Sequence, residues 1–491
     1  MELDAQLCYA ALQSRDPRFD GRFFTGVLTT GVYCRPICPA VTPRPENVRF
    51  YLSAAAAQAA GFRPCLRCRP EASPGTPDWQ GASALVSRGL RLISEGVLDE
   101  AGVDGLARRL NIGARHLRRL FVDQLGASPS TVAQTGRLHF ARRLIDETRL
   151  PMSEIAYSAG FTSLRRFNDA VRETYGKPPT ELRRSKPPAA GFSENNGLVL
   201  KLFYRPPFDW VALIRFLQAR AVPGVEAVQD NSYRRTVRLR EAVGIIEVRP
   251  VLQERHVLLS VPAQFSKDLL TITERVRDLF DLRTDPQAIE THLQADGLMR
   301  GLVQANPGLR VPGAWDGFEI AVRAILGQQI SVRAASTLAG RLVEAFGERL
   351  PQAEEEHLAR LFPTPERLAE ADLSEIGLTK PRLRSIRELA RAVCAGELAF
   401  KTSAGLEEAV ERLSALPGIG AWTAHYIAMR ALREPDAFPA GDLALRRAAA
   451  SEGSAPLSEV ELFERSSAWR PWRAYAAMHL WMRYGARQSS Q

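Results

Sequence analysis

The chain has 491 residues and a formal net charge of +10, with 45% hydrophobic and 24% charged residues. This length exceeds what a single hydrophobic core supports, so we expect three or four globular domains. No apolar run approaches the length of a membrane span, and the N-terminal segment carries acids where a signal peptide needs bases. We therefore expect a cytoplasmic protein with no membrane partner.

The basic excess is concentrated in the first part of the chain. Residues 1–190 hold 27 Lys and Arg against 18 Asp and Glu, whereas the remainder holds 38 against 37. Such a bias is typical of a segment that binds phosphates, although a solvated arginine-rich surface gives the same count. Charge alone leaves both interpretations open.

Four of the six cysteines form two close pairs, Cys34 with Cys38 and Cys65 with Cys68. In a cytoplasmic protein this arrangement favours metal over disulfides, and the spacing suits a tetrahedral Zn²⁺ site. A purely structural zinc is the commoner role of four-cysteine sites. Cys8 and Cys394 stand apart and are interpreted as small buried hydrophobic residues.

The residues around the cysteines add a specific resemblance. Segments 24–36 (FTGVLTTGVYCRP), 44–51 (RPENVRFY) and 60–65 (AGFRPC) resemble the N-terminal domain of the bacterial alkylation-response regulator Ada. The resemblance implies one Zn²⁺ held by the four paired cysteines, and it implies that Cys34 irreversibly accepts a methyl group from a DNA methyl phosphotriester. Methylation would change the charge of the site from about −2 to about −1, so the affinity for DNA should rise.

Two helix-turn-helix candidates follow between residues 98 and 184. The first places helix 103–110 before helix 114–121, and the second places a helix from Ser153 before one from Ser163, with a long helix 129–147 between them. Apolar residues at helical spacing are expected to form the core: Leu106, Leu110, Leu117, Leu120, Phe121, Ile155, Phe161 and Phe167.

This region resembles the AraC-type DNA-binding domain, including the closing segment GKPP at 176–179. In that arrangement the second helix of each unit enters the major groove. The side chains expected there are Arg115, His116, Arg118, Arg165, Arg166 and Asn168. Contact with a phosphate, or a solvated face, is at least as good an explanation for any one of them as base reading.

The pattern becomes strand-like at Leu198. Runs 198–204, 233–239, 244–248 and 256–261 are rich in β-forming residues, and an apolar helix is expected at 210–220. This predicts a small antiparallel sheet with helices. From about residue 265 the periodicity is helical to the end of the chain.

The segment LPGIG at 416–420 lies between two helical runs and is followed, after PAG, by Asp442. A helix–Gly-hairpin–helix offers backbone N–H groups and a helix N-terminus to a DNA phosphate. A carboxylate after it would lie beside the sugar of the gripped nucleotide, where a glycosidic bond can be broken. The same aspartate could also cap the helix that begins at Leu443.

Residues 198–486 resemble AlkA-type 3-methyladenine DNA glycosylases of the helix-hairpin-helix superfamily. The markers are YRPPFDW at 204–210, PGAWDGFE at 312–319, ILGQQIS at 325–331 and WRPWRAY at 469–475. The resemblance implies Asp442 as the catalytic carboxylate and Trp422, Tyr426 and Trp481 as an aromatic pocket that attracts a cationic base. It also implies DNA contacts by Leu416, Gly418, Ile419, Gly420, Gln329 and Ile330. Any one of the aromatic residues, and Ile330, could instead belong to the core.

Two absences sharpen this interpretation. Superfamily members that also cut the strand carry a lysine just after the hairpin, and here that position holds Trp422, so we expect a monofunctional hydrolase that leaves an abasic site. The Pro-Cys-His-Arg motif of the Ada methyltransferase domain does not occur, so we do not expect repair of O6-methylguanine. No cysteine set for an iron–sulfur cluster lies near the C-terminal end.

We therefore predict a multidomain α+β protein: a zinc domain (1–75), an all-α double helix-turn-helix domain (82–185), a linker (186–197), an α+β domain (198–285) and an all-α glycosylase domain (286–488). The expected function joins a methyl-activated transcriptional regulator to a glycosylase for alkylated purines. The expected partners are double-stranded DNA, at alkylated sites and promoters, and RNA polymerase. One alternative is a non-enzymatic transcription factor whose second half only binds alkylated DNA. Another keeps the glycosylase but makes the zinc purely structural.

Overall fold

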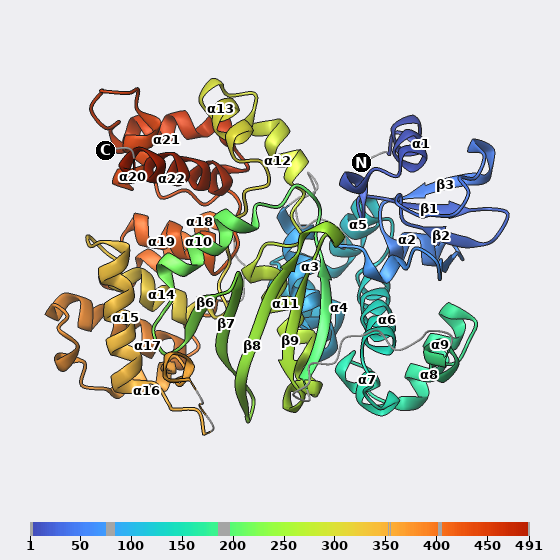
Figure 1. The fold of residues 1–491 in the computed structure, drawn as a ribbon, viewed down its shortest axis with the longest axis horizontal. Coiled ribbons are helices and arrows are strands. Elements are labelled where there is room, and N and C mark those ends of the chain that lie inside the picture. The colour runs from blue at the N-terminus through green and yellow to red at the C-terminus, as the bar shows by residue number, and fades with distance from the viewer. Residues whose placement is uncertain are drawn as a thin grey trace. The chain divides into compact units, whose positions relative to one another are not determined.

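The computed structural model describes residues 3–74, 84–184, 197–351, 353, 355–400 and 405–489 (Figure 1). The predicted linker, 186–197, and the boundary expected between residues 75 and 82 lie largely outside these residues. The chain divides into two compact units. The first comprises Met1–Pro206, Glu247–Arg277 and Leu282–Asp285, and the second comprises Pro207–Ile246, Asp278–Asp281 and Pro286–Gln491.

The first unit begins with a small sheet in the order β3-β1-β2-β4. Strands β1 and β3 pair antiparallel, as do β1 and β2, whereas β2 and β4 run parallel. Buried Phe24, Tyr33, Ala54 and Ala57 form the core between this sheet and helix α2. The elements are α1 (Ala5–Ser14), β1 (Phe24–Val27), β2 (Val32–Cys34), β3 (Val48–Tyr51), α2 (Ala54–Ala59) and β4 (Arg63–Pro64).

Seven helices follow in the same unit. They are α3 (Ala84–Ser94), α4 (Val97–Arg109), α5 (Ala114–Leu125), α6 (Pro129–Glu147), α7 (Met152–Ser158), α8 (Leu164–Tyr175) and α9 (Pro179–Arg184). Ser128 and Ser163 cap α6 and α8 through their hydroxyls. The range Val97–Arg109 contains two helices that meet at a kink, because Gly102 (φ 64°, ψ −170°) is non-helical; the second begins at Val103, as predicted. The predicted core is buried, with Leu120 and Phe161 half-buried.

The zinc module and the helical module pack against each other within this unit. Tyr33 lies next to Cys34, and its hydroxyl is 2.8 Å from Nε2 of His139 on α6. Ser53 Oγ donates to the carbonyl of Leu125, at the end of α5, at 2.7 Å. The zinc module is thus hydrogen-bonded to α6, through the residue next to Cys34, and to α5, one of the two helices expected to read DNA.

The α+β region contains a sheet in the order β5-β9-β8-β7-β6. Its elements are β5 (Gly197–Phe203), α10 (Trp210–Arg220), β6 (Glu226–Gln229), β7 (Ser232–Leu239), β8 (Ala242–Val251) and β9 (His256–Pro262). Strand β5 alternates buried and half-buried residues, as a one-sided sheet requires. The sequence predicted four of these strands and missed β6, which has only four residues.

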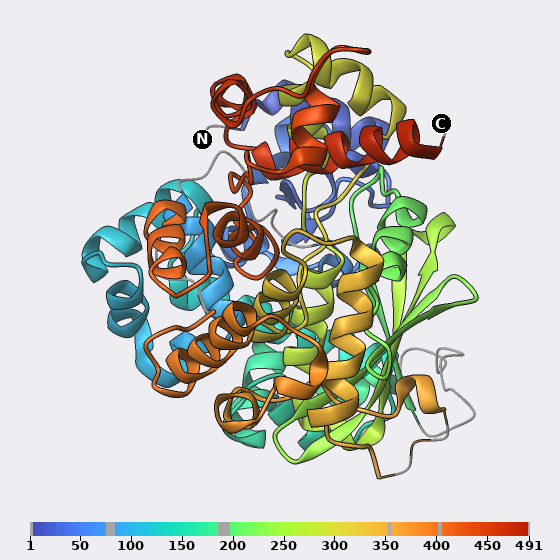
Figure 2. The ribbon, with the colours of Figure 1, turned by 90° about the vertical axis from the view of Figure 1, so that its left-hand side faces the viewer.

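The helices of the second unit form two groups, seen from two sides in Figures 1 and 2. One group holds α12 (Pro286–Leu293), α13 (Gly297–Ala305), α20 (Leu443–Ala449), α21 (Glu459–Ser466) and α22 (Arg473–Ser489). The other holds α14 (Gly317–Leu326), α15 (Val332–Phe346), α16 (Pro365–Glu370), α17 (Lys380–Cys394), α18 (Leu406–Ser414) and α19 (Ala421–Arg430). Helix α11 (Leu269–Leu279) leads into this region. None of the described helices is long and apolar enough to cross a membrane.

Candidate active site and metal centre

The hairpin between α18 and α19 depends on Gly418. This residue has φ of 79°, and a Cβ added to it would lie 2.0 Å from Oγ of Ser385. Both the backbone conformation and the space therefore require glycine. Among the described residues, no group accepts a hydrogen bond from the N–H of Gly418 or of Gly420. These two exposed N–H groups, at the N-terminus of α19, can bind a phosphate.

Leu416 and Ile419, the other two hairpin residues expected to contact DNA, point into the protein. Ile419 is buried, and Leu416 packs against the same core cluster. The N–H of Ile419 donates to the carbonyl of Leu416 at 3.1 Å, which closes the turn. The side chains of Leu416 and Ile419 therefore anchor the hairpin to the core, and the backbone N–H groups of the two glycines are the ones exposed to solvent.

The loop between α14 and α15 lies beside the hairpin. Gln328 Nε2 donates to the carbonyl of Gly418 at 2.8 Å and is 3.0 Å from Oγ1 of Thr423. Gln329 is exposed and has φ of 56°, whereas Ile330 is half-buried. Of these two expected DNA contacts, Gln329 is therefore the more exposed, and the adjacent Gln328 ties the loop to the hairpin.

Asp442 is held by three donors. It is the N-cap of α20, where Oδ1 accepts from the N–H of Leu445 at 3.0 Å. The indole Nε1 of Trp422 donates to Oδ2 at 3.0 Å, and Nε1 of Trp481 donates to Oδ1 at 3.3 Å. The carboxylate is thus fixed in direction and is also stabilised by the helix N-terminus. The carboxylate of Asp442 can therefore cap α20 and also take part in a chemical reaction.

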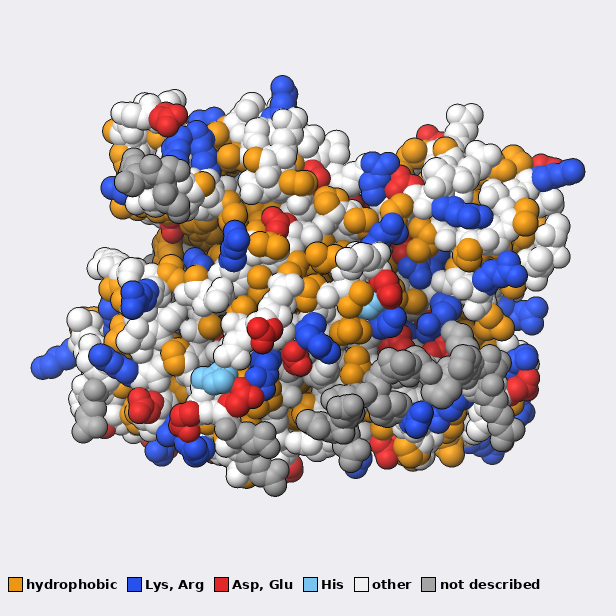
Figure 3. Space-filling view, in the orientation of Figure 1, with side chains coloured by type: hydrophobic (Ala, Val, Ile, Leu, Met, Phe, Trp, Pro, Cys, Tyr) orange, Lys and Arg blue, Asp and Glu red, His pale blue; other side chains and the backbone are white. Residues whose placement is uncertain are grey.

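The three predicted pocket aromatics lie together. Trp422 and Tyr426, one turn apart on α19, stack with ring centroids 5.6 Å apart and planes at 8°. Trp481 on α22 meets Tyr426 edge to face at 6.3 Å. All three are half-buried. Figure 3 shows a recess lined by hydrophobic side chains between helices α20 to α22 and helices α19 and α10.

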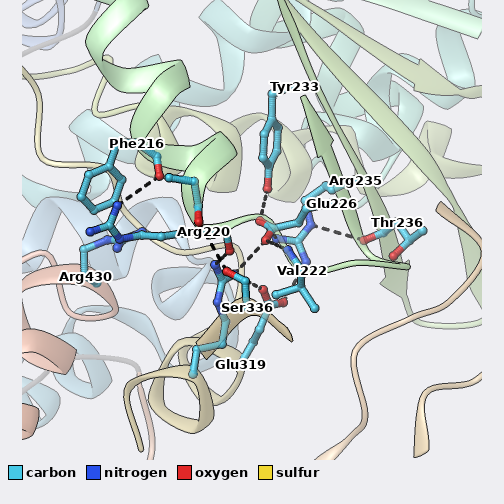
Figure 4. A network of polar contacts seen from close by, with 12 residues as sticks. Phe216, Arg220, Val222, Glu226, Tyr233, Arg235, Thr236, Glu319, Ser336 and Arg430 are labelled. Atoms are coloured by element: carbon cyan, nitrogen blue, oxygen red, sulfur yellow. Dashed lines mark hydrogen bonds and ion pairs between the residues drawn. The ribbon is translucent and has the colours of Figure 1, made fainter. Parts of the chain in front are cut away.

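A network of buried charges (Figure 4) reaches Tyr426 through Arg430. Arg430 Nη1 donates to the phenol oxygen of Tyr426 at 2.8 Å. Arg323 Nη1 is 2.9 Å from both Glu226 and Glu319, and Arg235 Nη2 is 2.8 Å from Glu319. Sequence reasoning missed this network. Glu319 and Arg323, spaced by four on the otherwise apolar α14, were the available signal.

The four predicted zinc ligands converge in the first unit. The sulfurs of Cys34, Cys38, Cys65 and Cys68 all lie within 4.8 Å of one another. This spacing suits a tetrahedral Zn²⁺ with Zn–S distances of about 2.3 Å, and such an ion would offset the repulsion among four thiolates. The backbone N–H of Arg35 donates to Sγ of Cys68 at 3.3 Å. Cys65 is half-exposed and the other three are buried, so exposure does not single out Cys34.

The candidate DNA-reading side chains lie on α5 and α8. Arg115, His116 and Arg118 are exposed on α5, and Arg165 and Arg166 are exposed on α8, with Asn168 half-buried. The opposite faces of these helices bury Leu117 and Phe167, among others. Of the two isolated cysteines, Cys8 is buried as predicted, but the prediction for Cys394 was wrong. Cys394 ends α17 and is exposed, because the core face of that helix is formed by residues such as Ile386 and Leu389.

The chain matches four families along its length. Residues 7–71 match the metal binding domain of Ada, and residues 106–185 match a helix-turn-helix domain. Residues 199–316 match the AlkA N-terminal domain, and residues 322–471 match the HhH-GPD superfamily of base excision DNA repair proteins. These matches and the clustered cysteines confirm the predicted fold class and the zinc site.

Relatives cover both the whole chain and its second half. A Mycobacterium tuberculosis protein named "Probable bifunctional transcriptional activator/DNA repair enzyme AlkA" is 46% identical over 485 residues, covering 98% of this chain and 97% of that protein. DNA-3-methyladenine glycosylase 2 of Escherichia coli is 36% identical, covering 58% of this chain and 97% of that protein. The structure of a 3-methyladenine DNA glycosylase from Archaeoglobus fulgidus shares the fold, with a TM-score of 0.51 and 23% identity over 58% of this chain and 98% of that one.

Fold and site together define a DNA-binding protein in which a zinc-containing regulatory half precedes a helix-hairpin-helix glycosylase half. The chain belongs to the family of bifunctional transcriptional activator/DNA repair enzymes that join Ada-type and AlkA-type domains. The predicted resemblance is thereby confirmed.

Proposed function

We propose that this protein is a bifunctional alkylation-damage response protein. Its second half hydrolyses the N-glycosidic bond of alkylated purines such as 3-methyladenine, and its first half activates transcription after accepting a methyl group from DNA. The observation that carries the glycosylase assignment is Asp442, fixed by two indole N–H groups beside an aromatic recess.

The proposed hydrolysis begins with an alkylated purine flipped out of the duplex and stacked against Trp422, Tyr426 or Trp481. The base carries a positive charge, so it is attracted to the aromatic faces and is a good leaving group. As its bond to the sugar breaks, positive charge grows on the sugar, and the carboxylate of Asp442 stabilises it. Water then bonds to the anomeric carbon, and its proton is released. No lysine stands in the hairpin or at the start of α19, so the strand stays intact.

The proposed phosphate grip uses the free N–H groups of Gly418 and Gly420. The loop at Gln329 and Ile330 is proposed to fill the space that the flipped nucleotide leaves. Both elements are tied together by the hydrogen bond from Gln328 to Gly418.

The proposed methyl acceptor is Cys34. Zinc bound by the four cysteines keeps their sulfurs as thiolates at neutral pH. The Cys34 sulfur attacks the methyl carbon of a DNA methyl phosphotriester; a sulfur–carbon bond forms, the carbon–oxygen bond breaks, and the phosphodiester leaves as an anion. The loss of one negative charge strengthens DNA binding by the arginines of α5 and α8. Promoter DNA and RNA polymerase are the proposed partners of this activated form.

The decisive experiment measures release of free methylated purine from alkylated duplex DNA by the wild type and by Asp442→Asn. A matched control is Asp296→Asn, which changes another helix N-cap, that of α13. We expect release to be lost only in Asp442→Asn, with the strand unbroken. Binding without release by the wild type would favour the non-enzymatic alternative.

A second experiment tests the sensor. After incubation with methyl-phosphotriester DNA, peptide mass spectrometry should place one methyl group on Cys34. A methyl group on Cys65, the most exposed ligand, would reassign the acceptor, and no methylation would leave the zinc purely structural.

A further inference from the structure

Tyr426 contacts the aromatic rings of Trp422 and Trp481, and its phenol oxygen contacts a cluster of arginines. Its ring stacks on Trp422 and is half-buried, so part of it can contact a base. Its phenol oxygen accepts from Arg430 Nη1 at 2.8 Å, and the charge of Arg220 on α10 also lowers the pKa of the phenol. Guanidinium groups only donate. Among the described residues, no oxygen or nitrogen accepts the phenol's own proton.

The cluster contains more positive than negative charge. Four guanidinium groups, those of Arg220, Arg235, Arg323 and Arg430, lie in this network with two carboxylates. Both carboxylates, Glu226 and Glu319, are engaged by Arg235 and Arg323. Arg430 is otherwise satisfied only by the neutral carbonyls of Pro312 and Gly313. The two guanidinium groups nearest the phenol therefore have no carboxylate partner in the described part of the chain.

An ionised phenol would supply the missing negative charge. Burial opposes ionisation, but the charges of Arg430, Arg220 and Arg323 outweigh it and lower the pKa of Tyr426. Of the other titratable groups on neighbouring elements, burial lowers the pKa of His425 to about 4, so it is neutral. Asp442 is directed to the indoles of Trp422 and Trp481 and not to the phenol. The hydroxyl of Tyr233 donates a hydrogen bond to Glu226, and burial raises the pKa of Tyr233, so this phenol stays protonated.

We propose that Tyr426 is a tyrosinate held by Arg220 and Arg430, and that its negative charge makes the pocket select purines that carry a positive charge. This inference rests on the proposed glycosylase function. Without the phenolate, the arginine cluster would repel a cationic base. With it, the repulsion is offset, and the extra electron density of the ring strengthens its attraction for the cation. Tyr426 is then a specificity-determining residue, and Arg220 and Arg430 are positioning residues.

Absorbance titration of the full-length protein tests the ionisation directly, because tyrosinate and tyrosine differ in the near ultraviolet. The wild-type spectrum minus that of Tyr426→Phe should show one tyrosinate at pH values well below the ordinary tyrosine pKa of about 10. Tyr9→Phe is the matched control, because the Tyr9 hydroxyl donates to the carbonyl of Pro43 at 3.0 Å. Arg220→Met should move the tyrosinate band to higher pH, and circular dichroism verifies that each variant is folded. If the tyrosinate band of Tyr426 is absent at pH values well below the ordinary tyrosine pKa of about 10, the proposal is overturned.

Base selectivity provides the second measurement. The ratio of kcat/KM for cationic 7-methylguanine to that for neutral hypoxanthine should fall about 10-fold in Tyr426→Phe, because the ring stays but its negative charge is lost. An unchanged ratio would refute the selectivity. If the wild type releases neither base, the proposed function is wrong and the selectivity claim is refuted with it. The titration still decides whether Tyr426 is ionised. Failure of the tyrosinate proposal can therefore be distinguished from failure of the proposed glycosylase function.

Discussion

Replacing Gly418 has a cost that the geometry of the hairpin defines. An alanine there would keep φ near 79°, and its Cβ would lie 2.0 Å from Oγ and 3.1 Å from Cβ of Ser385. The left-handed conformation costs about 1–2 kcal/mol for a residue with a Cβ. Forcing the extra atom against a buried side chain adds about 1–3 kcal/mol. We therefore expect Gly418→Ala to lower the free energy of unfolding of the glycosylase half by about 2–5 kcal/mol.

Two further variants separate these contributions. Gly420→Ala is the matched control, because Gly420 has φ of −83° and no atom lies within 4 Å of its added Cβ. Its cost should be below about 1 kcal/mol. The double variant Gly418→Ala/Ser385→Ala removes the closest atom but keeps the backbone strain, so about 1–2 kcal/mol should remain after correction for Ser385→Ala alone.

Urea unfolding followed by tryptophan fluorescence measures these differences, and affinity for duplex DNA with an abasic site measures the hairpin's function. Gly418→Ala should weaken this affinity more than Gly420→Ala does, because only the former displaces the turn. Equal stabilities for the two single variants, or no recovery in the double variant, would refute the reasoning.

Three other outcomes are expected. Trp481→Phe, which removes an N–H donor from Asp442, should lower kcat for base release by about 5–10-fold without changing the strand-intact product; an unchanged kcat would mean that the bond does not position the carboxylate. Burial lowers the pKa of His479 from its ordinary 6.5 to about 4. The unfolded chain therefore binds more protons between these values, and stability complete above about pH 6.5 should be lost as pH falls toward 4, by up to roughly 3 kcal/mol; His479→Gln should flatten this pH dependence in urea unfolding. Removing zinc with a chelator should abolish specific DNA binding by the first half and leave base release intact, and loss of both activities would contradict the separation of the two sites.

The sequence predicted best where local rules and packing agree. Helix α6 has the predicted bounds, because Ser128 caps it and Pro129 occupies its first position, where a proline is favourable. The spacing of the two cysteine pairs was also sufficient to predict the metal site, since it suits tetrahedral coordination and the four sulfurs do lie together. Asp442, Trp422 and Trp481 were predicted from a resemblance, and the structure adds the two indole hydrogen bonds that join them.

Features that depend on distant parts of the chain could not be predicted. The partners of Tyr426 come from α10, α14 and α19, and no local pattern relates these segments. Strand β6 was missed because it is short and begins with Glu226, a charged residue that is buried by a long-range ion pair with Arg323. The exposure of Cys394 depends on which face of α17 meets the core, and hydrophobicity alone assigned it wrongly.

The double role of Asp442 has an evolutionary consequence. Since asparagine also caps helices, the substitution Asp442→Asn would keep the cap of α20 while removing the charge that the proposed chemistry needs. Aspartate and asparagine codons differ by a single G-to-A transition, the change that unrepaired O6-methylguanine produces during replication. O6-methylguanine is a lesion that this protein is not expected to repair. In the Asp442 codon of its own gene, this lesion can cause the change to asparagine in one step. The resulting protein would bind damaged DNA without excising the base.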